Sequence, residues 1–246
     1  MKNINILIVE DEKLIALSLK RNLTDDGINV MAIADEGNLA LELVHELKPD
    51  LVIMDVMIKG DLTGVDVSEK IREFSSVPII FTSAVTTDDI LTRAKAVRPY
   101  GYLVKPVNYD ELKVSAEIAV SNYKYEQDLS RQKKFFCSCM EAIPAGVAIA
   151  GPDGNLLCCN HAFCLIAGGD PATIKGKNIR ELMPCPEVDS ILECQTEIDV
   201  PGEFPIVYLN KEGLNVPAQM NYNRVDDDID EGILHIFSFP VEFLKK

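Results

Sequence analysis

The 246-residue chain has no tryptophan, few aromatic residues and far fewer basic than acidic side chains. Its 24 Lys and Arg against 39 Asp and Glu give a formal net charge of −15, which argues against a nucleic-acid-binding surface because such a surface needs a basic patch. The most apolar stretch, residues 143–169, is interrupted by proline, aspartate and glycine and cannot span a bilayer. With no signal-peptide pattern either, we expect a cytoplasmic protein that binds neither nucleic acid nor membrane.

Cysteine is absent from the first 136 residues, and all seven cysteines follow that point. An odd number without a regular framework fits reduced thiols better than disulfides. The hydrophobic content of 47% and the charged content of 26% are those of a globular protein. The length and the uneven distribution of cysteine together predict two domains.

The first half of the chain alternates short apolar runs with segments whose apolar residues recur every three or four positions. The runs predict strands at residues 4–9, 29–34, 51–55, 78–82 and 102–104, and the segments between them predict helices. This alternation is typical of a doubly wound α/β fold with a parallel sheet covered on both faces. The right-handed crossover rule favours the flavodoxin-like order 2-1-3-4-5 for the five strands.

Polar side chains follow four of these predicted strands. Glu10 and Asp11 come after the first, and Asp55 ends the third. These strands are neighbours in the predicted order, so their carboxylates would meet at one edge and repel each other unless a cation lay among them. Thr82 ends the fourth strand and Lys105 follows the fifth, adding a hydroxyl and an ammonium. This set of groups suits in-line phosphoryl transfer to a carboxylate.

On these motifs, and on the run Gly101-Tyr-Leu-Val-Lys105-Pro106, residues 1–122 resemble the receiver domain of two-component response regulators. The resemblance implies that Asp55 accepts a phosphoryl group from a sensor histidine kinase or phosphotransfer protein. It also implies a Mg²⁺ site. The implied ligands are Glu10, Asp11, Asp55 and the backbone carbonyl of Met57, and the implied phosphoryl-reading residues are Thr82, Lys105 and Tyr102.

The loop after Asp55 departs from the family pattern. Many receivers have a Met-Pro pair there and a glycine eight residues past the aspartate. In this chain Ile58-Lys59 replaces the pair, and Gly64 lies nine residues on. The family's phosphoryl lifetime and choice of kinase therefore do not carry over.

Between Tyr109 and Ile143 the chain contains no glycine and no proline. We therefore expect the fifth helix to continue as a connector over residues 108–143. Every third or fourth residue forms a seam typical of a short parallel coiled coil, which predicts a homodimer. The seam residues are Ile118, Asn122, Tyr125, Leu129, Gln132, Phe136, Cys139 and Ile143. The alternative is a helix that packs on its own second domain through Phe135 and Phe136.

The chain after residue 143 predicts an α+β domain with an antiparallel sheet. Strands are expected at 146–150 and 156–159, a helix capped by Asn160 at 161–167, and later strands at 204–210, 214–225 and 232–239. The runs 141–155, 159–163 and 176–182 resemble a PAS domain, which we place at 144–243 as a sensory and dimerisation module. The cysteine motif of the flavin-linked light-sensing members is absent, and the resemblance assigns this domain no particular ligand.

The histidines and cysteines of this second half could suggest a metal or redox site, but their positions favour ordinary structural roles. His161 and His235 fit capping and strand positions better than haem ligation. The pairs Cys158-Cys159 and Cys137-x-Cys139 lack metal-ligand spacing and are interpreted as packed thiols.

The sequence thus predicts a response regulator whose phosphorylation is coupled through a helix to a PAS module. We expect only self-phosphoryl transfer and autodephosphorylation, not metabolic catalysis. One alternative is an aspartyl-phosphate phosphohydrolase, although relatives of haloacid dehalogenase usually carry a second Asp where this chain has Met57. Another is a fragment of a hybrid sensor kinase, although no histidine phosphoacceptor box or Gly-rich ATP lid is present.

Overall fold

The computed structural model describes residues 4–84, 88–193, 202–209, 215–227 and 232–240. The chain divides into two compact units, residues 1–130 and 131–246. Among the described residues, no helix has both the length and the apolar character that a membrane crossing requires.

The first unit contains a five-stranded parallel sheet with the order β2-β1-β3-β4-β5, which confirms the predicted flavodoxin-like topology. Its strands are β1 (Asn5–Val9), β2 (Asn29–Ala34), β3 (Leu51–Asp55), β4 (Ile79–Ser83) and β5 (Gly101–Val104). The helices that follow them are α1 (Lys13–Asp25), α2 (Gly37–Leu47), α3 (Gly64–Phe74), α4 (Asp88–Ala96) and α5 (Tyr109–Ala142).

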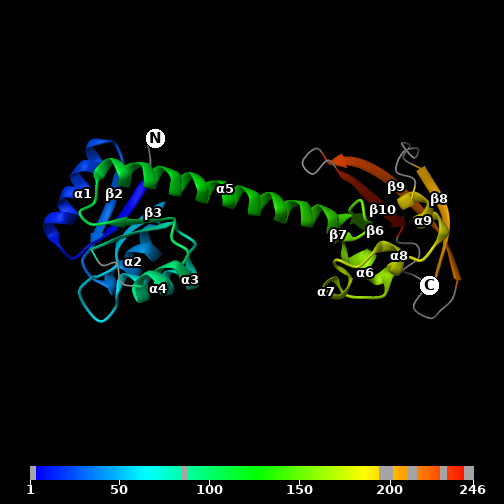
Figure 1. Ribbon diagram of the computed structural model, residues 1–246, viewed down its shortest axis with the longest axis horizontal. Coiled ribbons are helices and arrows are strands. Elements are labelled where there is room, and N and C mark those ends of the chain that lie inside the picture. The colour runs from blue at the N-terminus through cyan, green and yellow to red at the C-terminus, as the bar shows by residue number, and fades with distance from the viewer. Residues whose placement is uncertain (1–3, 85–87, 194–201, 210–214, 228–231, 241–246) are drawn as a thin grey trace. The chain divides into compact units, whose positions relative to one another are not determined.

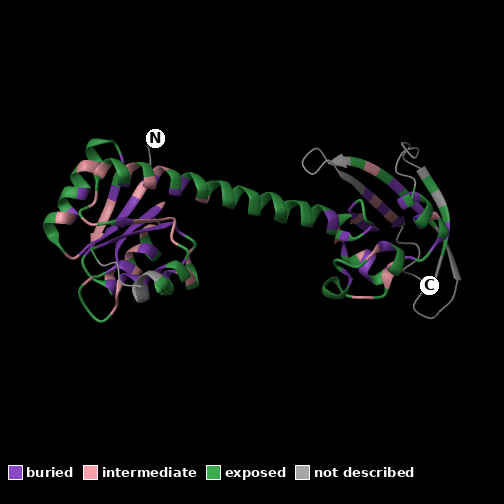
Figure 2. Ribbon diagram, viewed as in Figure 1, coloured by how far each residue is buried: buried purple, intermediate pink, exposed green. Residues whose placement is uncertain are grey.

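Helices cover both faces of this sheet (Figure 1). Leu19 of α1 and Leu112 of α5 pack with one set of strand residues, and Val44 of α2, Ile71 of α3 and Val97 beyond α4 pack with the alternate set. Every residue of β3 and β4 is buried, as Figure 2 shows for the middle of the sheet. Burial on both faces explains why these strands are continuous apolar runs and not alternating ones.

Helix α5 is a single helix from Tyr109 to Ala142, which confirms that the fifth helix continues into the connector. Leu112, Ala116 and Val120 are buried against the sheet. From residue 121 to 139 every position is exposed except the half-buried Tyr123 (Figure 2). Phe135 and Phe136 are 71% and 47% exposed. The alternative interpretation, in which these two phenylalanines are core contacts, is therefore wrong for this chain.

The second unit contains an antiparallel sheet with the order β7-β6-β10-β9-β8. Its strands are β6 (Ala145–Ala150), β7 (Leu156–Cys159), β8 (Gly202–Leu209), β9 (Asn215–Asp227) and β10 (Gly232–Pro240). The helices between β7 and β8 are α6 (His161–Ala167), α7 (Pro171–Ile174), α8 (Ile179–Leu182) and α9 (Pro186–Glu193). The predicted α+β architecture is confirmed, while the expected strand ends at Asn210 and Leu214 lie outside the described residues.

Asn160 connects three elements of the second unit and is 1% exposed. Its side-chain oxygen accepts hydrogen bonds from Phe163 N at 3.0 Å, which is the predicted cap of α6, and from Val147 N at 2.9 Å. Its amide nitrogen donates to Met140 O at 3.0 Å and to Ala145 O at 2.7 Å. One buried amide therefore joins the last turn of α5, the strand β6 and the helix α6.

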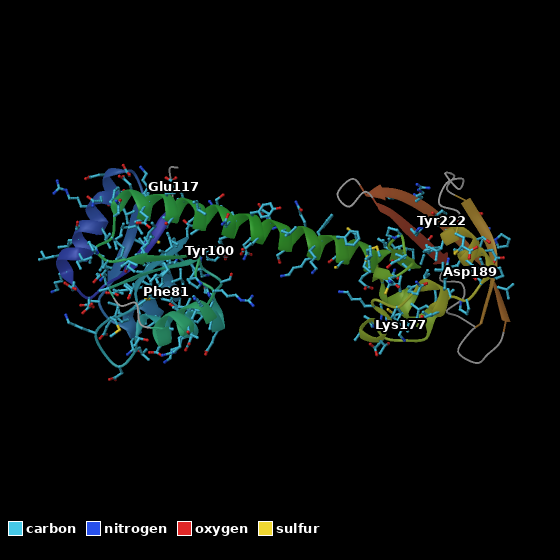
Figure 3. All side chains as sticks on the ribbon, viewed as in Figure 1. Phe81, Tyr100, Glu117, Lys177, Asp189 and Tyr222 are labelled. Atoms are coloured by element: carbon cyan, nitrogen blue, oxygen red, sulfur yellow. The ribbon has the colours of Figure 1, made fainter. Side chains whose placement is uncertain are left out.

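His235 is a buried strand residue of β10, as predicted. Its Nδ1 lies 3.0 Å from the hydroxyl of Tyr222 on β9, which is labelled in Figure 3. The expectation of packed thiols is wrong for Cys137 and Cys139, because both lie on the exposed part of α5. Cys158 and Cys159 are half-buried, and the sulfur of Cys159 lies 3.6 Å from that of the buried Cys164.

Candidate phosphotransfer site

The site lies where the carboxyl ends of β1, β3, β4 and β5 meet. Asp55 is the last residue of β3, and the sheet register places it beside Thr82 of β4. Glu10 and Asp11 follow the neighbouring strand β1 directly, and the N–H of Glu10 donates to Ala34 O at the end of β2. Parallel strands bring their carboxyl ends to one edge, and this is how residues distant in the sequence converge here.

The three acids form one cluster. Glu10, Asp11 and Asp55 can each offer a carboxylate oxygen such that these oxygens all lie within 4.8 Å of one another. Glu10 is 1% exposed and Asp55 is 5% exposed. Burial raises the pKa of Glu10, and the charge of Asp55 adds to this effect, while hydrogen bonding to Lys105 opposes it. A hard divalent cation would relieve this repulsion, and an all-oxygen donor set is what Mg²⁺ prefers, so these residues fit such an ion.

Lys105 provides the positive charge inside the cluster. Its Nζ lies 2.6 Å from Asp55 Oδ2 and 2.7 Å from Glu10 Oε2. Burial lowers the pKa of Lys105, but hydrogen bonds to Asp55 and Glu10 outweigh burial and leave the pKa raised. The backbone N–H of Lys105 donates to Ser83 O at 2.8 Å, and the peptide bond to Pro106 is cis. The ammonium is thus charged and held between two buried acids.

The other predicted site residues are not all placed alike: Thr82 and Met57 lie beside Asp55, whereas Tyr102 packs against the core. Thr82 is 1% exposed and its carbonyl accepts from Val56 N at 3.0 Å. The N–H of Met57 donates to Asp55 Oδ1 at 3.0 Å, which places the Met57 backbone beside the carboxylate. Tyr102 is half-buried and packs with the core beneath α2, α3 and α4, where its ring meets Phe81 edge-on at 6.5 Å between centroids. The structure therefore places Tyr102 on the Phe81 side of β5.

Gly64 is a site residue that the sequence showed only as a marker of loop length. Its N–H donates to Val56 O at 2.9 Å, and a Cβ at this position would lie 1.9 Å from Asp55 O. The loop can return to the end of β3 only with a residue that has no side chain. The signal that could have identified this requirement is a glycine at the start of a predicted helix immediately after a strand–loop unit.

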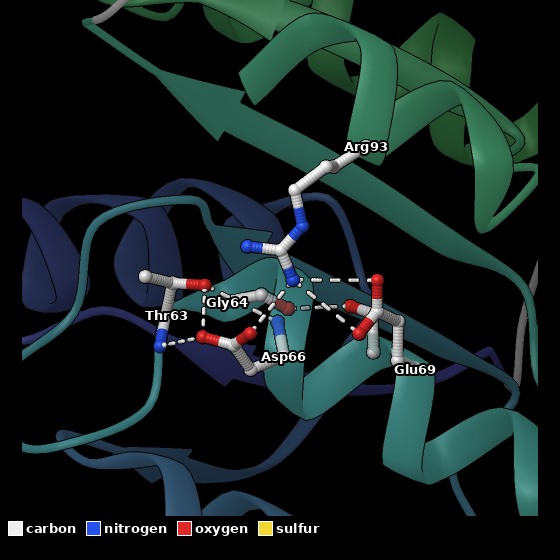
Figure 4. Close-up of polar contacts among 6 residues, drawn as sticks. Thr63, Gly64, Asp66, Glu69 and Arg93 are labelled. Atoms are coloured by element: carbon white, nitrogen blue, oxygen red, sulfur yellow. Dashed lines mark hydrogen bonds and ion pairs between the residues drawn. The ribbon is translucent and has the colours of Figure 1, made fainter. Parts of the chain in front are cut away.

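The first turn of α3 is tied to α4 by a polar cluster that we did not predict (Figure 4). Thr63 and Asp66 form a reciprocal capping box, and Arg93 Nη2 lies 2.7 Å from Asp66 Oδ1 and 3.3 Å from Glu69 Oε2. Hydrogen bonds from Arg93, and then from Thr63, lower the pKa of Asp66 to about 2. The Thr-x-x-Asp spacing was the available signal for the cap. The contact with Arg93 depends on how the two helices pack.

Comparison with known families agrees with this geometry. Residues 6–117 match the family model of the response regulator receiver domain, and residues 144–239 match that of a PAS domain. The chain is therefore a receiver domain followed by a PAS domain. Receiver domains generally hold Mg²⁺ at an acidic site such as this one.

Several individual proteins are similar to the receiver part. The transcriptional regulatory protein PdtaR of Mycobacterium tuberculosis is 38% identical over 120 residues, which are 48% of this chain and 58% of that protein. The transcriptional regulatory protein YvrH of Bacillus subtilis is 38% identical over 112 residues, which are 46% of this chain and 47% of that one. The receiver domain of a modulated diguanylate cyclase from Desulfovibrio desulfuricans G20 has 36% identity and a TM-score of 0.49, covering 50% of this chain and 99% of that structure. The chain spans about half the length of these curated relatives.

Proposed function

We propose that the protein is a response regulator of a two-component phosphorelay in which Asp55 is the phosphoacceptor. The observation that carries the proposal is the contact of Lys105 with Asp55 and Glu10 at the edge of the sheet where Asp11 and Thr82 also lie. The receiver family match and the relatives described as regulatory proteins support the same conclusion.

In the proposed reaction an oxygen of the Asp55 carboxylate attacks the phosphorus of a phosphohistidine. The new O–P bond forms as the N–P bond breaks, and the imidazole leaves. Met57 N–H and Lys105 already contact the two oxygens of Asp55, so the carboxylate is oriented before the donor arrives. Lys105 and the Thr82 hydroxyl would then neutralise and hydrogen-bond the phosphoryl oxygens.

Glu10, Asp11, Asp55 and the Met57 carbonyl would hold Mg²⁺ in this reaction. When bound, the ion would neutralise the negative charge that three carboxylates and a phosphoryl group bring together. Thr82, Lys105 and Tyr102 would then report the phosphorylated state to β5 and α5, and through α5 to the PAS domain. This coupling needs an element with two arrangements, and the β5–α5 face is the element we propose.

The partner that supplies the phosphoryl group is proposed to be a sensor histidine kinase or phosphotransfer protein. Beside Lys105 lies an apolar groove of about 320 Å³ between α1 and the start of α5. Its lining residues are Leu14, Ile15, Ser18, Leu19, Asn22, Lys105, Pro106, Val107 and Tyr109. Leu14 is 84% exposed at the edge of this groove, so a protein donor could cover it while its phosphohistidine reaches Asp55.

Exchange of Leu14 for glutamate distinguishes docking of a protein donor from the phosphoryl transfer itself. We expect L14E to accept phosphate from acetyl phosphate at the parent rate but from a phosphorylated histidine phosphotransfer protein at least about tenfold more slowly, because a charge replaces a buried apolar contact. Leu157→Glu, which changes a half-exposed leucine of the PAS domain, is the control and should match the parent with both donors. Equal slowing with both donors would contradict the docking role.

The second proposed contact is a homodimer formed along α5. The apolar seam residues Tyr125, Leu129 and Phe136 are 71%, 55% and 47% exposed in a single chain. A parallel copy of the same helix would cover them at heptad spacing. We further propose that the PAS domain contributes to this dimer.

The test of the proposed function is incubation of the full chain with radiolabelled acetyl phosphate. We expect label on the parent protein with Mg²⁺, none with EDTA, and none on Asp55→Asn. Equal labelling of D55N and the parent would refute the phosphoacceptor role. Steady multiple turnover of a phosphomonoester such as p-nitrophenyl phosphate would instead favour a phosphohydrolase.

A further inference from the structure

The loop that departs from the receiver pattern places a second lysine at the acidic cluster. Lys59 Nζ lies 3.6 Å from Asp11 Oδ2. Lys105 contacts the other two acids, Glu10 and Asp55. Among the described residues each of the three carboxylates therefore has a lysine partner, and the two lysines come from different loops.

The backbone of this loop fixes where Lys59 stands. Lys59 forms a parallel bridge with Glu36, the residue before α2. Gly60 follows with a φ of +103°, a backbone conformation that favours glycine, and it turns the chain immediately after Lys59. Beyond it Leu62 packs against Gly37, where an added Cβ would lie 3.1 Å from Leu62 Cβ. The position of Lys59 beside Asp11 thus follows from the path of the loop and is not simply a chance placement of a long side chain.

The two lysines differ in how firmly they are held. The Lys105 side chain is 13% exposed and lies between two buried acids, whereas the Lys59 side chain is 75% exposed and Asp11 is 17% exposed. Breaking an exposed ion pair with an N···O distance of 3.6 Å costs little free energy, so Lys59 can move away from Asp11 easily. Asp11 nevertheless supplies one of the three oxygens that a divalent ion would need.

We propose that Lys59 is a built-in counterion of the metal site. It neutralises Asp11 when no divalent ion is bound, competes with the ion for that carboxylate, and so sets the Mg²⁺ concentration at which the site fills. The inference rests on the proposed function, because it concerns the same acids. Lys59 acts through Asp11 and is a positioning residue.

The expected size of the effect follows from the exposure of the pair. An exposed ion pair that is lost on metal binding should weaken that binding roughly 1.5- to 5-fold, and the effect should shrink as salt screens the charges. Removal of the ammonium should therefore tighten the metal site and leave the fold intact, because the Lys59 side chain is 75% exposed.

The experiment measures metal binding to the full chain without any phosphodonor. Mg²⁺ is titrated by isothermal calorimetry, and Mn²⁺ by the electron paramagnetic resonance signal of the free ion. We expect Lys59→Met to bind both ions about 1.5- to 5-fold more tightly than the parent at low salt, with the difference shrinking at high salt. Lys59→Arg should bind as the parent does.

The matched control is Lys70→Met, which removes the same charge from an exposed position of α3. An unchanged or lower affinity in K59M, or an equal gain in K70M, would overturn the counterion role. Labelling of Asp55 by acetyl phosphate at saturating Mg²⁺ separates the two proposals. If K59M is labelled but binds metal no more tightly than the parent, only the role of Lys59 is refuted. If neither the parent nor K59M is labelled but K59M binds metal more tightly than the parent, only the role of Asp55 as phosphoacceptor is refuted.

Discussion

At the scale of single residues, the site is a balance between three carboxylates and two ammonium groups. Lys105 lies between the buried acids Glu10 and Asp55, and its raised pKa keeps it charged across the physiological range. The pKa of Glu10 is raised by its burial and by the nearby charge of Asp55. A divalent cation among these acids would relieve their mutual repulsion, which is the physical reason for the proposed Mg²⁺ site.

The sequence predicted the acids, Thr82 and Lys105 because each directly follows or ends a strand, and the topology of a parallel sheet brings strand ends together. It could not predict that Lys59 faces Asp11 or that Arg93 reaches Asp66. Those contacts depend on the path of a loop and on the packing of two helices, neither of which leaves a periodic signal. Gly64 was visible in the sequence, but its closeness to the Asp55 carbonyl was not.

Asp66 gives a prediction about pH. Its pKa is lowered from the ordinary 3.8 to about 2, so its contribution to stability is present above the ordinary value and is lost as the pH falls toward 2. We expect Asp66→Asn to lower the free energy of unfolding at neutral pH by up to about 1 kcal/mol, because the pair is partly exposed. The measurement is urea unfolding of the receiver transition in the full chain.

The deficit of D66N should disappear as the pH approaches 2, where the parent carboxyl is itself protonated. Glu69→Gln is the control, since Glu69 contacts the same Arg93 but takes no part in the cap, and its effect should be smaller. A deficit of D66N that stays constant from neutral to acid pH would show that the charge of Asp66 contributes nothing.

At the scale of elements, the burial of α5 changes along its length. Its first turns are buried against the receiver sheet, its middle is exposed, and Met140 near its end is 8% exposed, with its carbonyl bound by Asn160. The absence of glycine and proline predicted the length of this helix correctly.

Two native cysteines test the seam directly. Cys139 falls on the heptad seam and Cys137 falls off it, and both are exposed. In a parallel dimer the two copies of Cys139 face each other at a distance that a disulfide can bridge, whereas the copies of Cys137 point apart. We expect oxidation by diamide to give a covalent dimer on a non-reducing gel for the parent and for Cys137→Ser. Cys139→Ser should stay monomeric on the gel, and a crosslink that depends on Cys137 would exclude this seam.

At the scale of the whole molecule, one continuous helix connects a receiver domain to a PAS domain. The parallel half was predicted strand by strand because βα units have a strong alternating pattern. The strands of the antiparallel half were also predicted, but their order in the sheet was not, because pairing between β6 and β10 joins strands about 90 residues apart and no local pattern encodes it. Asn160 was predicted as a helix cap, but its bonds to α5 and β6 became visible only in the structure.

Fluorine NMR of the full chain with beryllofluoride tests the central claim most directly, because this phosphoryl mimic binds an acceptor carboxylate only where a metal and a cation complete the site. We expect bound fluorine resonances for the parent in the presence of Mg²⁺ and their absence in Asp55→Asn or with EDTA. Folded parent protein that shows no bound resonance at saturating Mg²⁺, or a D55N variant that shows the same resonances, would contradict it.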